Sequence, residues 1–453
     1  MGGQLLMNRI IFTTLLALFV AISLVTHPKP ASASDLLFYY DLALKSDPQF
    51  TGSKYEHLAN REVLDQAYAG LLPKIYGDAD YTFTGQDIRS SDNTVFAVGS
   101  TSYESRGFSL NLVQPLFRYG SFLGVGQARS ALKRADLELE KAKQDLALRL
   151  VEAYMDILSA YDKLLAIKAE EDAVQSHYEL AKMRTANGLA PITDLYDSEA
   201  RLAAVSAQRV EAENFLEDKK QALVEICGTT AIETKPLKTD IPLAAPFPDK
   251  LENWVAAATT QNLAVLIQKY KAEIAEKEIE RQKAAHYPSI DFQADYVLKD
   301  TDGTLFGGGS NTLTYDFIFK INVPIYEGGL IASKTREASN KHRSAVQALE
   351  KEVRAAERKA RLDYSGVMSA MSRVDAMKKS IQAQNLVVEA KQEGFKAGLF
   401  IGIAVLDSLQ DLYRYKKEYS QARNDYVLNT LRLKHAVGTL NDEDIRQLNS
   451  WLQ

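Results

Sequence analysis

The sequence predicts a mainly α-helical protein that also carries a small antiparallel β-sheet, built from two copies of one unit. Three observations lead to this fold class. The stretch from Gln127 to Asn187 contains neither glycine nor proline and would form a helix about 90 Å long at 1.5 Å per residue. Four short segments alternate apolar and polar residues with the period of two that is typical of strands. Landmarks of the first half return about 210 positions later, and repetition indicates a duplicated unit.

Residues 1–33 have the features of an export signal. Arg9 precedes an apolar run from Ile10 to Val25, and the small residues Ala31-Ser32-Ala33 follow it. We expect cleavage after Ala33. The alternative is a membrane anchor, but the run is shorter than the roughly 20 apolar residues that a spanning helix needs.

The first unit, residues 34–227, is predicted to contain a helix, two strands, the long helix and a shorter helix, in that order. Asp35 is a candidate N-cap for the first helix, and Pro73 ends it. The expected bounds are 34–72 for the first helix, 75–84 and 108–115 for the strands, 120–187 for the long helix and 193–227 for the short one.

The second unit, residues 249–440, repeats this order of elements after a proline-rich connection at residues 228–248. The expected bounds are 251–285 for its first helix, 290–298 and 313–323 for its strands and 330–397 for its long helix. Four landmarks support the duplication: Pro288 follows Pro73 by 215 positions, Pro324 follows Pro115 by 209, Gly398 follows Gly188 by 210 and Asp407 follows Asp197 by 210.

The long helices need partners along most of their length. Apolar residues recur at alternating steps of four and three, which is coiled-coil spacing. They are Leu146, Leu150, Tyr154, Ile157, Tyr161 and Leu164 in the first long helix and Val346, Leu349, Val353, Ala356 and Ala360 in the second. Each short helix has about half the length of a long one, so we expect two to flank each long helix end to end. The connection 228–248 and the tail 441–453 should then form a belt at mid-height.

Four strands cannot close a barrel, and a sheet in lipid must close because every unpaired backbone group costs several kcal/mol there. Chains must therefore pool strands, eight from two chains or twelve from three. The polar face of the strands carries Asp78, Asp80, Asp291, Asp295 and Lys320. Unpaired charges need water, and an eight-stranded barrel is filled by its side chains. These residues therefore favour the twelve-stranded homotrimer.

Composition argues against several other classes of protein. The net charge is −5, without the basic stripe that nucleic-acid binding requires. Cys227 is the only cysteine, so neither a disulfide framework nor a thiolate metal site is expected. The six histidines are scattered, and we find no catalytic pair, so we expect no enzyme activity, metal or cofactor.

The chain resembles TolC-type outer membrane efflux proteins over nearly its whole mature length. The resemblance rests on Leu72-Pro73 before the first strand, Gln114-Pro115-Leu116-Phe117 after the second, and Thr193-Asp194-Leu195 and Val405-Leu406-Asp407-Ser408 at the turns that follow the long helices. It implies a trimer with a twelve-stranded barrel in the outer membrane and an α-helical barrel across the periplasm. It further implies an exit duct for small molecules or secreted proteins, which docks onto a periplasmic adaptor protein and an inner-membrane pump.

The same resemblance implies an acidic entrance at the inner end of the duct. The matching positions are Asp194 and Asp197 in the first turn and Ala404 and Asp407 in the second, so one acidic position is missing. The family's basic residue two places after the second turn glycine is Phe400 here. Three copies of Asp407 near a narrow axis would attract cations. Alternatively, Asp197 and Asp407 are solvated or paired with neighbours.

The turn residues Gly188, Leu189, Gly398 and Leu399 are candidates for adaptor docking. The two leucines could instead fold back on their own helices as cap contacts. A periplasmic coiled-coil adaptor or scaffold without a channel is the alternative function, but such a protein would not need four amphipathic strands. An exported enzyme should show a convergent polar cleft, and we can assign no residues to one.

Overall fold

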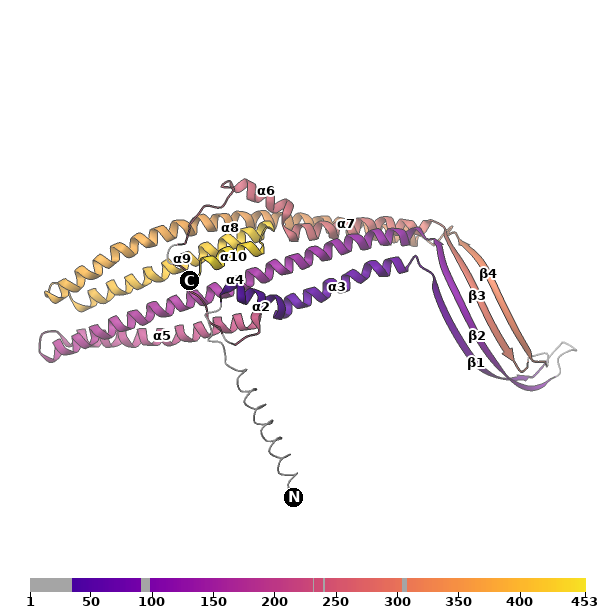
Figure 1. The fold of residues 1–453 in the computed structure, drawn as a ribbon, viewed down its shortest axis with the longest axis horizontal. Helices are drawn as coiled ribbons and strands as arrows, with labels where there is room; N and C mark the ends of the chain where they lie inside the picture. The colour runs from indigo at the N-terminus through magenta and orange to yellow at the C-terminus, as the bar shows by residue number, and fades with distance from the viewer. Residues whose placement is uncertain (1–34, 91–97, 231, 239–240, 304–307) are drawn as a thin grey trace, which may run out of the picture.

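The computed structural model describes residues 35–90, 98–230, 232–238, 241–303 and 308–453, so the expected export signal lies outside the described residues. The molecule is a long bundle of helices with a four-stranded sheet at one end (Figure 1). In chain order the elements are α2 (Leu36–Ser46), α3 (Pro48–Ala69), β1 (Lys74–Ile88), β2 (Gly99–Phe117), α4 (Tyr119–Ala186), α5 (Ile192–Cys227), α6 (Leu251–Gln261), α7 (Leu263–Lys283), the 3-10 turn η1 (Ala284–His286), β3 (Ser289–Thr301), β4 (Ser310–Asn322), α8 (Leu330–Lys396), α9 (Gly402–Val437) and α10 (Asp442–Ser450). Within this part of the chain, no helix combines the length and the apolar character needed to cross a membrane.

The long helices α4 and α8 contain 68 and 67 residues, about 100 Å each at 1.5 Å per residue. Toward the sheet end, α4 packs against α3 and α7, and α8 packs against α7; toward the opposite end, which we call the tip end, α4 packs against α5 and α9, and α8 packs against α9. Most of the predicted seam of α4 is buried. The prediction was wrong for Tyr161, which is 46% exposed, and for Val346 of α8, which is 38% exposed.

The first helix of each unit is broken, whereas the sequence pattern predicted one continuous helix over 34–72 and one over 251–285. The breaks are at Asp47 and Asn262, whose backbones are non-helical with ψ near 120° to 130°. Each starts a new helix by accepting a hydrogen bond from the backbone N–H three residues later, at 2.7 Å from Phe50 and 3.1 Å from Val265. Pro48 adds to the first break, because a residue before proline disfavours the helical conformation.

These breaks let the short helices meet end to end at mid-length. Ser46 Oγ donates to the carbonyl of Cys227, the last residue of α5, at 2.8 Å. In the second unit Asn262 Nδ2 donates to the carbonyl of Ala436 near the end of α9, also at 2.8 Å. Each long helix is therefore flanked by two shorter helices whose ends are joined by a hydrogen bond.

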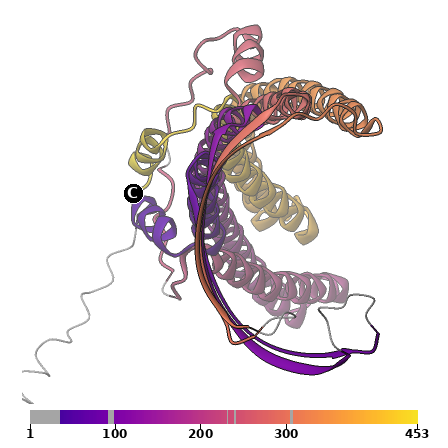
Figure 2. The ribbon, with the colours of Figure 1, turned by 90° about the vertical axis from the view of Figure 1, so that its right-hand side faces the viewer.

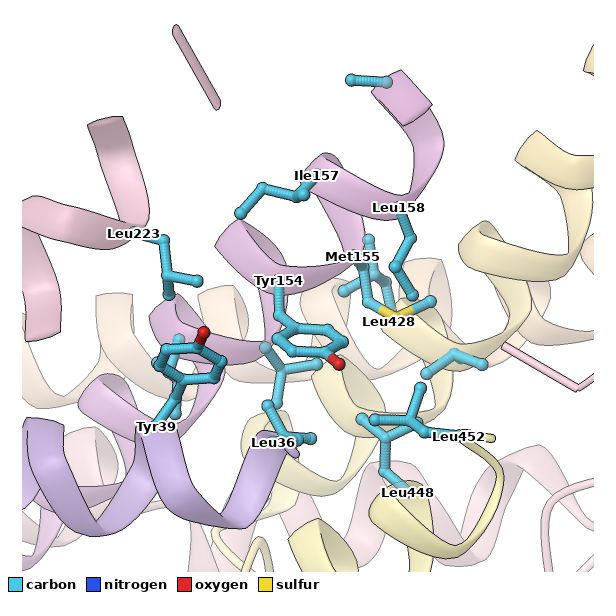
Figure 3. Close-up of a cluster of buried hydrophobic side chains, with 14 of the residues drawn as sticks. Leu36, Tyr39, Tyr154, Met155, Ile157, Leu158, Leu223, Leu428, Leu448 and Leu452 are labelled. Atoms are coloured by element: carbon cyan, nitrogen blue, oxygen red, sulfur yellow. The ribbon is translucent and has the colours of Figure 1, made fainter. Parts of the chain in front are cut away.

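The main hydrophobic core lies at this junction (Figure 3). Leu36 and Tyr39 of α2, Leu150 and Tyr154 of α4 and Leu448 of α10 are at most 2% exposed. Burial of this kind is worth roughly 1.5–3 kcal/mol for each large apolar side chain. The core therefore ties the first helix, the first long helix and the C-terminal helix together at one level.

Three tyrosine hydroxyls fix the connection at residues 228–248 to that core. Tyr39 pairs with both the N–H and the carbonyl of Glu233, Tyr154 with those of Lys235, and Tyr426 with those of Ala244, at 2.8 to 3.1 Å. These contacts give buried phenols the partners that they require. The C-terminal tail also binds this connection. The N–H of Gln453 donates to the carbonyl of Pro236 at 3.0 Å, and Leu237 forms an antiparallel bridge with Leu452.

The sheet is antiparallel throughout, with strand order β1-β2-β3-β4. Its register places the predicted apolar residues on one face. One row across the four strands is Gly77, Leu110, Tyr296 and Tyr315, and the next is Ala79, Phe108, Leu298 and Leu313. The neighbouring row in the direction of the β1–β2 hairpin contains Tyr81, Arg106, Asp300 and Asn311. On β2, β3 and β4 the apolar face therefore ends before this row, whereas on β1 it continues through Tyr81 to Phe83.

One charge predicted to face water does not. Asp291 is 9% exposed and accepts two hydrogen bonds from the guanidinium of Arg118, both at 2.8 Å. Arg118 precedes α4 and Asp291 lies on β3, so this bidentate pair joins the helices to the sheet. Asp78, Asp80 and Lys320 are exposed in the single chain, and Asp295 is partly exposed.

Asp47 provides a test of the break in the first helix. It is 2% exposed, caps α3 and accepts from Arg149 Nη2 of α4 at 2.9 Å. Replacing Asp47 with Ala should cost about 1 kcal/mol for the cap and a further 1.5–3 kcal/mol, roughly, for the charged hydrogen bond. Replacing it with Asn should keep the cap and cost less.

The midpoint of urea unfolding in detergent, followed by circular dichroism, measures both losses. Asp41, on the exposed side of α2, is the control, and Asp41→Asn should change stability by less than about 0.5 kcal/mol. Equal midpoints for D47A and D47N would contradict the capping role.

Candidate functional site at the hairpin tips

The two long helices end in the same turn. Gly188 and Gly398 have φ of +70° and +78°, a conformation that only glycine adopts without strain. Gly188 donates to the carbonyl of Thr185 at 3.0 Å and Leu189 to that of Arg184 at 2.8 Å; Gly398 and Leu399 repeat both bonds at 3.1 and 2.8 Å. This is the Schellman motif, which reverses the chain after a helix. It makes α4–α5 and α8–α9 two hairpins, which we call the first and the second hairpin.

Apolar side chains are exposed at both tips. Leu189 is 67% and Leu399 78% exposed. Neither is therefore buried against its own helix, which was the alternative that the sequence left open. They stand among further exposed apolar residues, namely Ile192, Tyr196, Ile401 and Ile403. Exposed apolar residues that gather in one place are typical of interaction surfaces.

The acidic candidates occupy three different environments. Asp194 lies in the first turn of α5 and is partly buried, where the positive end of the helix favours a carboxylate. Asp197 is exposed. Asp407 pairs with Arg201, with 3.5 Å between Nη2 and Oδ1, and its side chain remains 60% exposed.

Arg201 connects the two hairpins. It lies on α5, and its partners Asp407 and Gln410 both lie on α9. Arg201 could not be found from the sequence, because it lies 206 positions from Asp407 and only the packing of the hairpins brings the two residues together. The structure does not show the candidate acids paired with one another.

Phe400 is folded back on its own hairpin. A Cβ at position 394 would lie 2.4 Å from Phe400 Cδ2, so the ring occupies space that only a glycine leaves free. Phe400 is 45% exposed. Where TolC-type proteins are expected to have a basic residue, this chain therefore has an aromatic ring that packs on the last turn of α8.

His177 of α4 is buried between the hairpins near the tip. It is 8% exposed, and its ring lies 5.1 Å from that of Phe395 on α8. The guanidinium of Arg184 lies over the ring of Phe395, 4.7 Å from its centroid. Burial lowers the pKa of His177, Asp194 opposes this shift and Arg184 adds to it. This cluster could not be predicted from the sequence, because none of its members lies within four positions of His177.

Further polar contacts join the hairpins at the level of the belt and beyond it in the direction of the tip. Ser159 Oγ donates to Gln421 Oε1 at 2.9 Å, Ser420 donates to Asp162, and Arg432 pairs with Glu152 at 2.8 Å. Each contact joins α4 to α9. Polar pairs of this kind can exchange protein partners for water at small cost.

The family model described as outer membrane efflux protein matches residues 39–229 and 254–439 of the chain. Among curated proteins, the chain is 29% identical to the outer membrane protein TolC of Vibrio cholerae, across 97% of this chain and 98% of that protein. It is 25% identical to the proteases secretion protein PrtF of Dickeya chrysanthemi, across 93% and 92%. The crystal structure of the outer membrane protein VceC from Vibrio cholerae superposes with a TM-score of 0.75 at 18% identity, across 89% of this chain and 96% of that one.

Proposed function

The chain belongs to the outer membrane efflux protein family and is an outer membrane channel for export, and from this premise we propose that three copies assemble into one duct with a gate at the hairpin tips. The family is one of channels, and we propose that the chain catalyses no reaction. A periplasmic scaffold without a channel is not favoured, since the family match and the amphipathic sheet both require a membrane-embedded part.

The free edges of the sheet support assembly. Within the described residues, β1 pairs only with β2 and β4 only with β3, so two strand edges have unpaired backbone groups. Tyr315, Phe317 and Phe319 of β4 are 67 to 71% exposed on the apolar face. An open edge cannot persist in lipid. β1 runs away from the helices and β4 runs back toward them, so β4 of one copy can pair antiparallel with β1 of the next.

The curvature and the charges of the polar face favour three copies. Viewed from the sheet end, the helices and the sheet follow one arc (Figure 2). Asp295 and Asp316 lie directly opposite each other on the polar face of this arc. Like charges at this spacing repel unless water solvates them. A twelve-stranded barrel leaves room for that water, whereas side chains fill an eight-stranded one.

Disulfide crosslinking between the strand edges tests the assembly. A cysteine at Ala79 of β1, combined in turn with one at Leu313, Tyr315 or Phe317 of β4, should form disulfides between chains and yield species of up to three chains. Cysteines at the paired positions 110 and 296 are the control and should crosslink within one chain. Native mass spectrometry in detergent should show three chains; a complex of two would support the eight-stranded barrel instead.

We further propose that the exposed apolar tips dock onto a periplasmic adaptor protein, which connects the duct to an inner-membrane pump. A passive duct consumes no fuel, so the partner must supply the energy. Leu189 and Leu399 support this proposal, since each is more than 60% exposed at the end of a rigid turn.

Photocrosslinking in cells tests the docking. A photoreactive residue at position 189 or 399 should capture an adaptor that mass spectrometry identifies. The control position is Val210, which is 49% exposed on α5 away from the tip. Capture of the same proteins from all three positions would count against docking through the tips.

The gate that we propose is the contact between the hairpins, with Arg201 as its charged link. Opening requires the second hairpin to move away from the first, and the Arg201–Asp407 pair is one of the contacts that must break. Asp194, Asp197 and Phe400 lie at the same end of the molecule and would line or border the entrance.

Planar-bilayer recordings of Arg201→Gln and Asp407→Asn test this link. Either change removes the pair and should raise the fraction of time that the channel is open, and the double variant should open no more than the stronger single one, because both act on one contact. Arg209→Gln is the matched control, since Arg209 pairs with Glu171 and Glu213 inside the first hairpin. Additive effects of the two variants, or the same effect from R209Q, would contradict the proposal.

A further inference from the structure

The imidazole of His177 lies against the start of a helix in the opposite hairpin. A Cβ at Gly402, the first residue of α9, would lie 2.6 Å from His177 Nε2 and 3.7 Å from Phe395 Cε2. Glycine at this position therefore lets the histidine of α4 approach the backbone of α9. The contact exists only while the two hairpins are together.

This environment favours a neutral ring. Burial between Phe395 and the backbone of α9 removes water that an imidazolium would need. The amino end of a helix carries partial positive charge, so α9 repels a cation at this place. Two charged groups also act on the ring: Arg184 of α4 itself repels a proton, and Asp194 of α5 attracts one.

We propose that His177 makes the entrance sensitive to acid, because its protonation opposes contact between the hairpins and so favours the open state. This inference deepens the proposed gate and rests on that function. His177 needs no added ligand to act, since the proton itself is the effector.

The direction follows from linkage. The pKa of His177 is lowered while the hairpins are in contact, and it returns toward the ordinary value of about 6.5 once they separate and water reaches the ring. Above pH 7 both states hold a neutral ring, and the contact is at full strength. As the pH falls through about 6.5, the open state gains a proton that the closed state disfavours. The ratio of open to closed should then rise by up to about tenfold for one chain between pH 7.5 and 5.5.

Single-channel recordings of the assembled protein in planar bilayers test this, over pH 7.5 to 5.5. The unmodified channel should be open for a larger fraction of time at pH 5.5, and His177→Gln, which keeps a neutral polar side chain, should remove most of that rise. His57→Gln is the matched control, because His57 also faces α4 but pairs with Asp136 inside the first unit. It should keep the full response to pH.

A second pair of variants tests the contact without titration. The backbone of Gly402 has no positive φ, so alanine is not strained there by its backbone conformation. Its Cβ would collide with His177 alone. Gly402→Ala should raise the open fraction at pH 7.5, and His177→Ala combined with it should bring that fraction back down, because the smaller side chain removes the collision.

The outcomes separate the two proposals. Channels that respond to pH equally with and without His177, or a Gly402→Ala variant that His177→Ala does not correct, would overturn the role of His177 and leave the channel itself intact. Absence of any conductance at every pH would overturn the proposed duct, and this inference with it.

Discussion

The sheet with two unpaired edges is the constraint on which the rest of the molecule depends. In the part of the chain that the structure describes, β1 pairs with β2 alone and β4 with β3 alone, and four strands are too few to close a barrel. In lipid such a sheet must pair with strands of other copies of the chain. The helices of those copies must then assemble with the same rotational symmetry as the strands. A chain that curves as one segment of a tube, in its helices as in its strands, satisfies both requirements (Figure 2).

Much of this fold could be predicted from the sequence because it depends on periodicity. A run of sixty-one residues without glycine or proline, strands of period two and landmarks repeated about 210 positions apart predict most of the elements and their order. The breaks at Asp47 and Asn262 were missed for a physical reason. Both residues lie inside helical apolar patterns, which hid the cap at Asn262 and outweighed the local signal of Asp47 followed by Pro48. In the structure α5 and α9 end beside these breaks. The Arg118–Asp291 pair was missed in the same way, since it depends on where α4 leaves the sheet.

The residues of the candidate site also fall into two groups: those with a local signal in the sequence and those that depend on distant partners. Gly188 and Gly398 could be found from the sequence, because a left-handed turn after a helix leaves a local signal. Arg201 and His177 could not. Their partners lie more than 200 positions away on the second hairpin, and a lone arginine or histidine on a long helix is usually solvated. The gate that we propose thus depends on contacts between the two repeats, which neither repeat encodes alone.

The distribution of packing along the bundle determines where it can move. At the belt, large side chains are fully buried, and tyrosine hydroxyls bind the connecting backbone with paired hydrogen bonds. Toward the tip, the hairpins are held together by the partly exposed Arg201–Asp407 pair, a few polar contacts, the buried His177 and a smaller apolar cluster of α8 and α9 against which Ala173 of α4 packs. Local opening follows the regions with fewest buried apolar contacts. We therefore expect the hairpins to separate at the tip while the belt holds their other ends, which is the movement that the proposed gate needs.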